Sequence, residues 1–168
     1  MKITIVKITV FALMTMISLN MEAQNKKADL SYVSTVELSA DKVWEQMRIM
    51  DNIDELSSFV ASVKWDGPKG VGGTRVCSTP DGQGYFKEQI LNFNDAERSY
   101  TWQVVEGVPA KQVINSFKVV DLGLNRSMIV WTSNFEFMEN PNMTEEQFRN
   151  FLQTAVTEMV ENMVSLAK

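Results

Sequence analysis

The segment Thr144–Leu166, TEEQFRNFLQTAVTEMVENMVSL, decides the fold. Thr144 and Gln147 have the spacing of a capping box, in which two side chains satisfy backbone N–H groups at the start of a helix. Two glutamates follow Thr144 in the first turn, where the helix dipole favours negative charge. The segment is predicted to be one long helix whose apolar face must be covered, because apolar residues recur every three or four positions: Phe148, Phe151, Leu152, Ala155, Val156, Met159, Val160 and Met163.

The chain before this helix has the pattern of a β-sheet. Its apolar runs are separated by short turns rich in Gly, Pro, Asn and Asp, which is typical of consecutive hairpins. No proline interrupts a run. Because the turns are short, neighbouring strands are expected to be antiparallel. The predicted strands are Leu30–Leu38, Val60–Trp65, Thr74–Thr79, Tyr85–Phe93, Ser99–Glu106, Gln112–Leu122 and Ser127–Phe137.

Two short helices are expected after the first strand. Ala40–Arg48 has apolar residues at helical spacing and Ser39 at its N-cap position. Asp51–Ser57 has the same character, with Asp51 as its expected N-cap. A curved antiparallel sheet has one face that must be covered, and the long last helix can cover it while leaving a hollow beneath. The sequence therefore predicts an α+β fold, with a curved antiparallel sheet wrapped on a long C-terminal helix.

The first 24 residues have the pattern of a cleaved secretory signal peptide. Lys2 and Lys7 accompany the apolar run Ile8–Leu19, and the small residue Ala23 lies at a plausible cleavage site. The run is too short to span a bilayer comfortably, although a retained membrane anchor is the alternative. We therefore expect a secreted or periplasmic protein, with residues 25–168 as a single domain and no stable membrane insertion after cleavage.

Composition excludes several kinds of site. The chain contains no histidine and a single cysteine, Cys77, so the common Ser-His-Asp and Cys-His systems, His or thiolate zinc sites and an internal disulfide are excluded. No nucleotide-binding loop is recognisable, and neither a metal nor a cofactor is predicted. The net charge of −5 and the scattered basic residues argue against nucleic acid as a partner.

Several short fragments, in a fixed order and spacing, resemble one known superfamily. They are Ser39–Trp44, Val63–Trp65, Gly72–Arg75, Glu88–Ile90, Asp95 with Arg98 and Tyr100, and Val130–Trp131. In this order they resemble the START-like superfamily, also called Bet v 1-like or SRPBCC, and most of all its polyketide cyclase/dehydrase branch. The resemblance covers Leu30–Lys168. It implies the helix-grip fold, with a deep apolar cavity between the sheet and the last helix. Members bind lipids, sterols, hormones or polyketides, and a minority catalyse cyclisation or dehydration.

Strand alternation and helix periodicity indicate which residues face that hollow. Asn115 and Ser133 are the candidate hydrogen-bonding partners for the polar end of a ligand. For the aromatic and methionine positions, plain core packing is the alternative to ligand contact. The predicted ligand-binding residues are Phe86, Glu88, Ile90, Tyr100, Trp102, Asn115, Phe117, Trp131, Ser133, Phe151, Val156, Met159 and Met163. By resemblance, the loops Pro80–Gly84 and Gly107–Ala110 fall where family members carry the loops of the cavity mouth; ordinary hairpin turns are the alternative.

Glu88 is the candidate with the most distinctive chemistry, because it falls on the apolar side of its strand. By resemblance, a carboxylate at this position in the plant hormone receptors of the superfamily points into the cavity and orders water around the ligand. A buried carboxylate without a partner could act as a general acid or base. Arg75, Arg98 or Tyr85 could instead make Glu88 part of a structural pair.

These observations favour an exported small-molecule-binding protein without a cofactor. Its ligand is expected to be apolar or amphipathic, such as a lipid, a sterol or a polyketide-like molecule. One alternative is a cyclase or dehydratase-type enzyme in which Glu88 is the general acid/base, assisted by Tyr85 or Asn115. Another is a filled domain that acts through its surface. The sequence leaves open whether the protein is a monomer or a homodimer.

Overall fold

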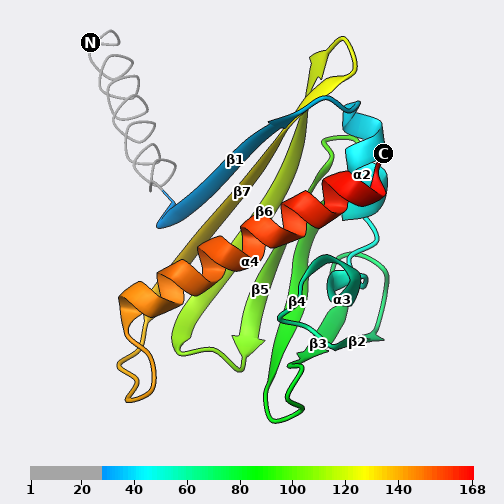
Figure 1. The fold of residues 1–168 in the computed structure, drawn as a ribbon. Helices are drawn as coiled ribbons and strands as arrows, with labels where there is room; N and C mark the ends of the chain where they lie inside the picture. Colours follow the sequence, from blue (N-terminus) through cyan, green and yellow to red (C-terminus); the bar gives the residue numbers. More distant parts are fainter. Residues whose placement is uncertain (1–27) are drawn as a thin grey trace, which may run out of the picture.

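The computed structural model describes residues 28–168, which form one curved sheet and three helices (Figure 1). The predicted signal peptide lies outside these residues. The elements follow one another in the predicted order: β1 (Leu30–Val36), α2 (Ala40–Met47), α3 (Ile53–Leu56), β2 (Ser62–Asp66), β3 (Thr74–Ser78), β4 (Tyr85–Asn94), β5 (Ser99–Glu106), β6 (Ala110–Gly123), β7 (Arg126–Phe137) and α4 (Glu145–Leu166).

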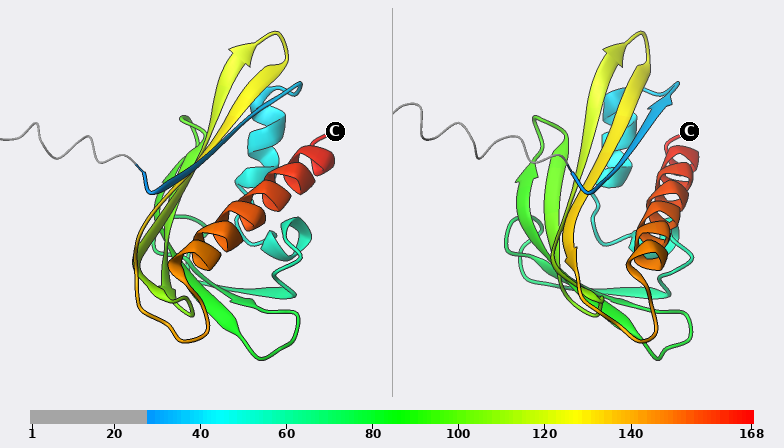
Figure 2. Two further views of the ribbon diagram at one scale, coloured as in Figure 1. Left: turned by 60° about the vertical axis from the view of Figure 1, so that its left-hand side comes forward. Right: turned by 90° about the vertical axis from the view of Figure 1, so that its left-hand side faces the viewer.

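All seven strands belong to one antiparallel sheet with the order β1-β7-β6-β5-β4-β3-β2. The last strand, β7, therefore lies beside the first, β1, and Leu30 lies opposite Ser133. Register shifts occur in β4 and β6, as is common in strongly bent strands. The sheet curves around α4, which crosses its concave face (Figure 2). This arrangement confirms the predicted helix-grip fold.

The predicted capping box begins α4. The backbone N–H of Gln147 donates to the Thr144 hydroxyl at 3.2 Å, and the backbone N–H of Thr144 donates to the Gln147 side chain at 2.8 Å. Phe148, Val156 and Val160 on this helix are buried against the sheet. Within residues 28–168, no helix is both long enough and apolar enough to cross a membrane.

The predicted cap of the second short helix is wrong. The N-cap of α3 is Asn52, whose side chain makes no capping hydrogen bond, and the helix is a single turn. Asp51 instead forms an ion pair with Lys69 in the loop between β2 and β3. This pairing takes the carboxylate away from the helix start, so α3 is held by the burial of Ile53 and Leu56.

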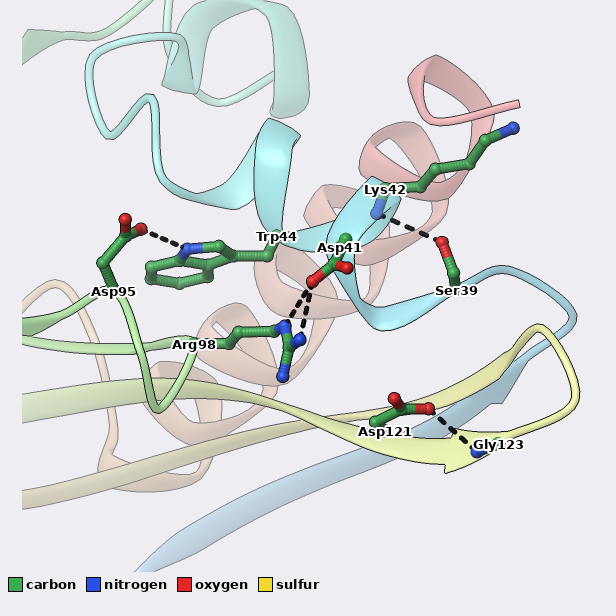
Figure 3. Close-up of polar contacts among 8 residues, drawn as sticks. All are labelled: Ser39, Asp41, Lys42, Trp44, Asp95, Arg98, Asp121 and Gly123. Atoms are coloured by element: carbon green, nitrogen blue, oxygen red, sulfur yellow. Dashed lines mark hydrogen bonds and ion pairs between the residues drawn. The ribbon is translucent and has the colours of Figure 1, made fainter.

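Beneath α2 the concave face is filled with aromatic rings. Trp44 of α2 stacks on Phe93 with a centroid distance of 5.6 Å. Tyr100 and Phe117 both stack on Trp102. Polar contacts hold α2 in place (Figure 3): the indole N–H of Trp44 donates to Asp95 at 2.6 Å, and Arg98 pairs with Asp41. Core side chains therefore fill the concave face beneath α2.

Candidate functional site

A cavity of about 90 Å³ lies between the sheet and α4. Trp102 of β5 and Met159 of α4 both line it, so the sheet and the helix are not in contact throughout. Drug-sized ligands usually occupy pockets of about 300–1,000 Å³, and an engineered cavity of about 150 Å³ holds benzene. This inner cavity therefore accommodates a group of a few heavy atoms and not a whole sterol or lipid.

The inner cavity adjoins an open depression of about 490 Å³, called the mouth below. The mouth is lined by residues of both loops expected at the rim, including Pro80, Gly84 and Gly107. Four residues line the inner cavity and the mouth alike: Phe59, Phe86, Val108 and Phe151. Among them, Phe59 and Phe151 meet edge to face with a centroid distance of 5.1 Å. These four side chains form the boundary between the two spaces.

An ion pair between Arg75 and Glu88 forms the polar centre of the inner cavity. The two residues lie opposite each other on β3 and β4, and their side chains are 1% and 7% exposed. The guanidinium also donates to the backbone carbonyl of Met50, and the indole N–H of Trp102 donates to the second oxygen of Glu88 at 2.7 Å. Both carboxylate oxygens thus have donors. Of the three predicted partners of Glu88, the structure selects Arg75, since Arg98 pairs with Asp41 and Tyr85 bonds to Glu106.

Burial and the ion pair change the acid–base behaviour of this region. Burial alone would lower the pKa of the Arg75 guanidinium, but the adjacent Glu88 carboxylate reverses this and raises that pKa. Burial, reinforced by Glu88, raises the pKa of the Cys77 thiol to about 12. Burial also raises the pKa of the Tyr100 hydroxyl. Cys77 and Tyr100 therefore stay protonated near neutral pH, and Cys77 is a buried thiol, as predicted.

One residue of the inner cavity wall has a buried acceptor without a partner. Asn115 of β6 is 3% exposed, and its side-chain oxygen Oδ1 makes no hydrogen bond. Ser133 lies opposite Asn115 on β7, is fully buried and also has an unpartnered hydroxyl, but it does not line the cavity. Buried polar groups are normally hydrogen-bonded, so Asn115 and Ser133 are exceptions in this part of the sheet. The Asn115 oxygen itself has almost no accessible surface and is therefore closed off from the cavity that the residue lines.

The structure separates the predicted site residues into two groups. Eight line the inner cavity: Phe86, Glu88, Trp102, Asn115, Trp131, Phe151, Val156 and Met159. The other five, Ile90, Tyr100, Phe117, Ser133 and Met163, are buried outside it. Strand alternation identifies the face of the sheet correctly for the four that lie on strands, and helix periodicity identifies the inner face of α4 for Met163. All five are buried where the rest of the core fills the space.

Sequence reasoning missed about half of the cavity wall. The additional lining residues are Ile53, Ser57, Phe59, Val60, Arg75, Val104, Val108, Leu152 and Ala155. Leu152 and Ala155 belong to the apolar stripe of α4 and could have been included on that basis. Phe59 and Val108 lie in loops, where no periodicity indicates a direction. Among residues 28–168, no group of three or more His, Cys, Asp or Glu side chains is arranged to hold a metal ion.

Comparisons with known proteins agree with this architecture. Protein XoxI from Bacillus cereus has a TM-score of 0.71 at 19% identity, over 83% of this chain and 94% of that chain. Norcoclaurine synthase from Thalictrum flavum, in complex with dopamine and hydroxybenzaldehyde, has a TM-score of 0.67 at 17% identity, over 82% and 84%. The Zhui aromatase/cyclase from a Streptomyces species has a TM-score of 0.67 at 15% identity, over 82% and 92%. At these identities the likeness shows the fold alone.

A sequence-level comparison identifies the family. No curated protein matches the chain. A family model described as polyketide cyclase/dehydrase and lipid transport, however, matches residues 27–168. Because this match spans most of the chain and the fold agrees with it, the protein belongs to the polyketide cyclase/dehydrase and lipid transport family, within the START-like, Bet v 1-like (SRPBCC) superfamily.

Proposed function

We propose that the protein binds one small apolar or amphipathic molecule between the sheet and α4. One end of this molecule occupies the inner cavity, and the remainder lies in the mouth. The observation that carries the proposal is that Phe59, Phe86, Val108 and Phe151 line both spaces. A molecule that passes between these four side chains reaches a wall that is largely apolar and contains a few polar groups, which is typical of ligand pockets.

The dimensions restrict the ligand. The inner cavity of about 90 Å³ takes a chain end of a few heavy atoms, whereas the mouth of about 490 Å³ takes a larger body such as a ring. A rigid sterol could enter the inner cavity only if Phe59 and Phe151 separated. A flexible chain or a ring with a chain attached fits without this separation, so lipid-like and polyketide-like molecules are better candidates than sterols.

The enzymatic alternative has less support. A general acid or base must exchange a proton with the substrate, and donation from Arg75 and Trp102 to the two oxygens of Glu88 stabilises its carboxylate in the charged form instead. Of the two residues expected to assist Glu88, Asn115 lines the inner cavity, whereas Tyr85 is exposed at the mouth and donates to Glu106 at 3.1 Å. The geometry therefore favours Glu88 as a structural group and polar anchor of the cavity.

We also propose that the protein is exported. This proposal rests on the basic residues and the apolar run within residues 1–24. Expression of the full chain in a Gram-negative host, followed by fractionation and N-terminal sequencing, tests it. A mature periplasmic or secreted chain that begins after Ala23 or Gln24 is expected. An uncleaved chain retained in the membrane would overturn it.

Binding is tested by titrating the protein, purified after expression of the full chain, with N-phenylnaphthylamine. This neutral dye fluoresces in apolar surroundings. Saturable binding at one site is expected. The variant Ala155→Leu adds three carbon atoms to the cavity wall and should weaken binding at least about tenfold, the equivalent of about 1.4 kcal/mol.

The matched control is Thr154→Leu, an exposed change at the neighbouring position of α4. Binding by this variant should stay within about twofold of the wild type, since surface substitutions have small effects. Absence of saturable binding in the wild type, or equal binding by the wild type and Ala155→Leu, would overturn the proposed function. The free energy of unfolding of each variant, measured in urea, shows whether it is folded.

A further inference from the structure

We infer that the side-chain amide N–H of Asn115 anchors the inner end of the ligand by donating to an uncharged oxygen acceptor, such as a ketone or ester carbonyl. This inference rests on the proposed function and deepens it, because it names the chemistry of the ligand end that enters the inner cavity. It places the acceptor near the chain end of the ligand and not in the larger body that occupies the mouth.

The amide group of Asn115 presents its nitrogen, and not its oxygen, to open space. The residue is 3% exposed and lines the inner cavity. Its oxygen Oδ1 is closed off, whereas Nδ2 retains accessible surface and has no hydrogen-bond partner among the described residues. A buried N–H without an acceptor destabilises the folded protein, and a ligand oxygen that reaches it removes this penalty.

Asn115 lies on the inner side of the boundary between the two spaces. It lines the inner cavity but not the mouth, and the boundary consists of the four side chains that line both. An oxygen that accepts from Nδ2 therefore belongs to the part of the ligand that has passed this boundary. Since the inner cavity of about 90 Å³ holds only a few heavy atoms, this oxygen lies near the end of the ligand.

The acceptors of the inner cavity wall already have donors. Glu88 accepts from Arg75 at one carboxylate oxygen and from Trp102 at the other. The Ser57 hydroxyl oxygen accepts from the backbone N–H of Phe59 at 3.4 Å. A ligand O–H would have to share one of these oxygens, whereas a ligand carbonyl meets a donor without a partner. The wall therefore favours a ligand group that accepts a hydrogen bond over one that donates.

The acceptor at the inner end is expected to be uncharged. Arg75 and Glu88 are the charged residues of the inner lining within the described chain, and their charges cancel. A carboxylate beside Asn115 would receive a hydrogen bond from the amide but no counter-charge of its own, and a buried charge without a counter-charge is very unfavourable. This argument restricts the inner end alone, because a charge at the outer end lies in the open mouth.

The position of the acceptor is tested with two isomeric ketones, benzylacetone and butyrophenone, in competition with N-phenylnaphthylamine. Both carry a phenyl ring and a four-carbon chain, but the carbonyl lies next to the chain end in benzylacetone and beside the ring in butyrophenone. The measured quantity is the ratio of their affinities, compared between the wild type and Asn115→Leu so that differences in hydration cancel. The preference for benzylacetone should fall about three- to tenfold in Asn115→Leu, the range that one net hydrogen bond provides.

The matched control is Asn134→Leu on β7. Asn134 also has a buried oxygen without a partner, but it lines neither the inner cavity nor the mouth. The ratio of the two affinities should stay within about twofold of the wild type in this variant. The same ratio in the wild type and Asn115→Leu, or an equal fall in both variants, would overturn the role of Asn115.

Infrared spectroscopy of bound benzylacetone, isotopically labelled at its carbonyl carbon, detects the hydrogen bond directly. A carbonyl that accepts a hydrogen bond absorbs at a lower frequency than the same ketone in hexane. The lowered frequency is expected in the wild type, and a return toward the hexane value is expected in Asn115→Leu. A hexane-like frequency in the wild type would overturn the inference without any variant.

The requirement for an uncharged acceptor is tested with hydrocinnamate, in which a carboxylate oxygen replaces the terminal methyl group of benzylacetone. Hydrocinnamate should bind the wild type more weakly than benzylacetone at neutral pH, because its charge would be buried without a counter-charge. Tighter binding of hydrocinnamate would overturn this requirement.

The outcomes separate this inference from the proposed function. If N-phenylnaphthylamine does not bind and neither ketone binds, the proposed function fails. If the dye binds but neither ketone displaces it, or if the ketones bind with the same ratio of affinities in the wild type and Asn115→Leu, the function stands and the inference fails.

Discussion

Arg75 and Glu88 lie directly opposite each other on β3 and β4 and form an ion pair at a position that water hardly reaches. The two charges cancel each other. The Arg75 guanidinium also donates to the Met50 carbonyl, and the Trp102 indole N–H donates to the Glu88 carboxylate. A polar group can therefore line the inner cavity without adding net charge to it. The pair is better regarded as part of the cavity wall than as a reactive centre.

Removal of one partner of this pair should be severely destabilising. Glu88→Gln leaves the Arg75 guanidinium buried without a counter-charge, which costs about 3–5 kcal/mol. The double variant Arg75→Met/Glu88→Gln should recover much of this loss. Urea denaturation measures both. Glu97→Gln, in the exposed pair with Lys118, is the control and should cost less than about 1 kcal/mol. Equal costs for Glu88→Gln and Glu97→Gln would contradict the burial of the Arg75–Glu88 pair.

Alkaline pH should destabilise the protein partly through Cys77. Burial raises the pKa of its thiol from 9.0 to about 12, so between these values the unfolded chain ionises while the folded protein does not. The contribution of this thiol to the free energy of unfolding is therefore fully present below pH 9 and is lost as the pH rises toward 12, by up to about 1.4 kcal/mol per pH unit. Cys77→Ala should show a shallower fall. Parallel curves of unfolding free energy against pH for the two proteins would refute this contribution.

The capping box should contribute measurably to the stability of α4. Thr144→Ala removes the hydroxyl that accepts from the Gln147 N–H and should lower the free energy of unfolding by about 1 kcal/mol. Thr154→Ala, at an exposed position within the same helix, should have little effect or a slight stabilising effect, because alanine favours the helix. If thermal or urea denaturation gave both variants the same change, the cap would not have its predicted role.

Gly107 should be the least replaceable glycine of the mouth. Its φ is +92°, and a Cβ there would overlap the Tyr85 carbonyl and lie 2.7 Å from the Phe86 Cα. Gly123 has a φ of +73° but open space around it. Gly123→Ala should therefore cost only the conformational term, about 1–2 kcal/mol. Gly107→Ala should cost clearly more and should weaken dye binding, since the mouth backbone must shift. Similar losses of unfolding free energy in Gly107→Ala and Gly123→Ala would contradict the close approach of Gly107 to the Tyr85 and Phe86 backbone.

The fold could be predicted largely from the sequence, because its determinants are local. The Thr144–Gln147 capping box, the apolar stripe of α4 and the alternation around Glu88 each fix a helix or a strand face without reference to the remainder of the chain. The N-cap of α3 could not be predicted, because Asp51 forms an ion pair with Lys69, a residue distant in sequence.

The site could be predicted only in part. Alternation shows that Tyr100 and Phe117 face the same side as Trp102, but it does not show that rings beneath α2 fill their end of the sheet. The small volume of the inner cavity depends on how closely Phe59 and Phe151 approach, which is set by a loop and a helix far apart in the chain. The choice of Arg75 as the partner of Glu88 depends on the register of β3 against β4.

The most direct test of ligand entry between the sheet and α4 is NMR spectroscopy of protein labelled at its methionine methyl groups. Met159 lines the inner cavity, whereas Met163, one turn further along α4, is buried outside it. With bound benzylacetone, intermolecular NOEs to the methyl group of Met159 and none to that of Met163 are predicted, with the Met159 signal assigned from Met159→Leu. NOEs confined to the exposed Met138, or none under saturating ligand, would contradict the account.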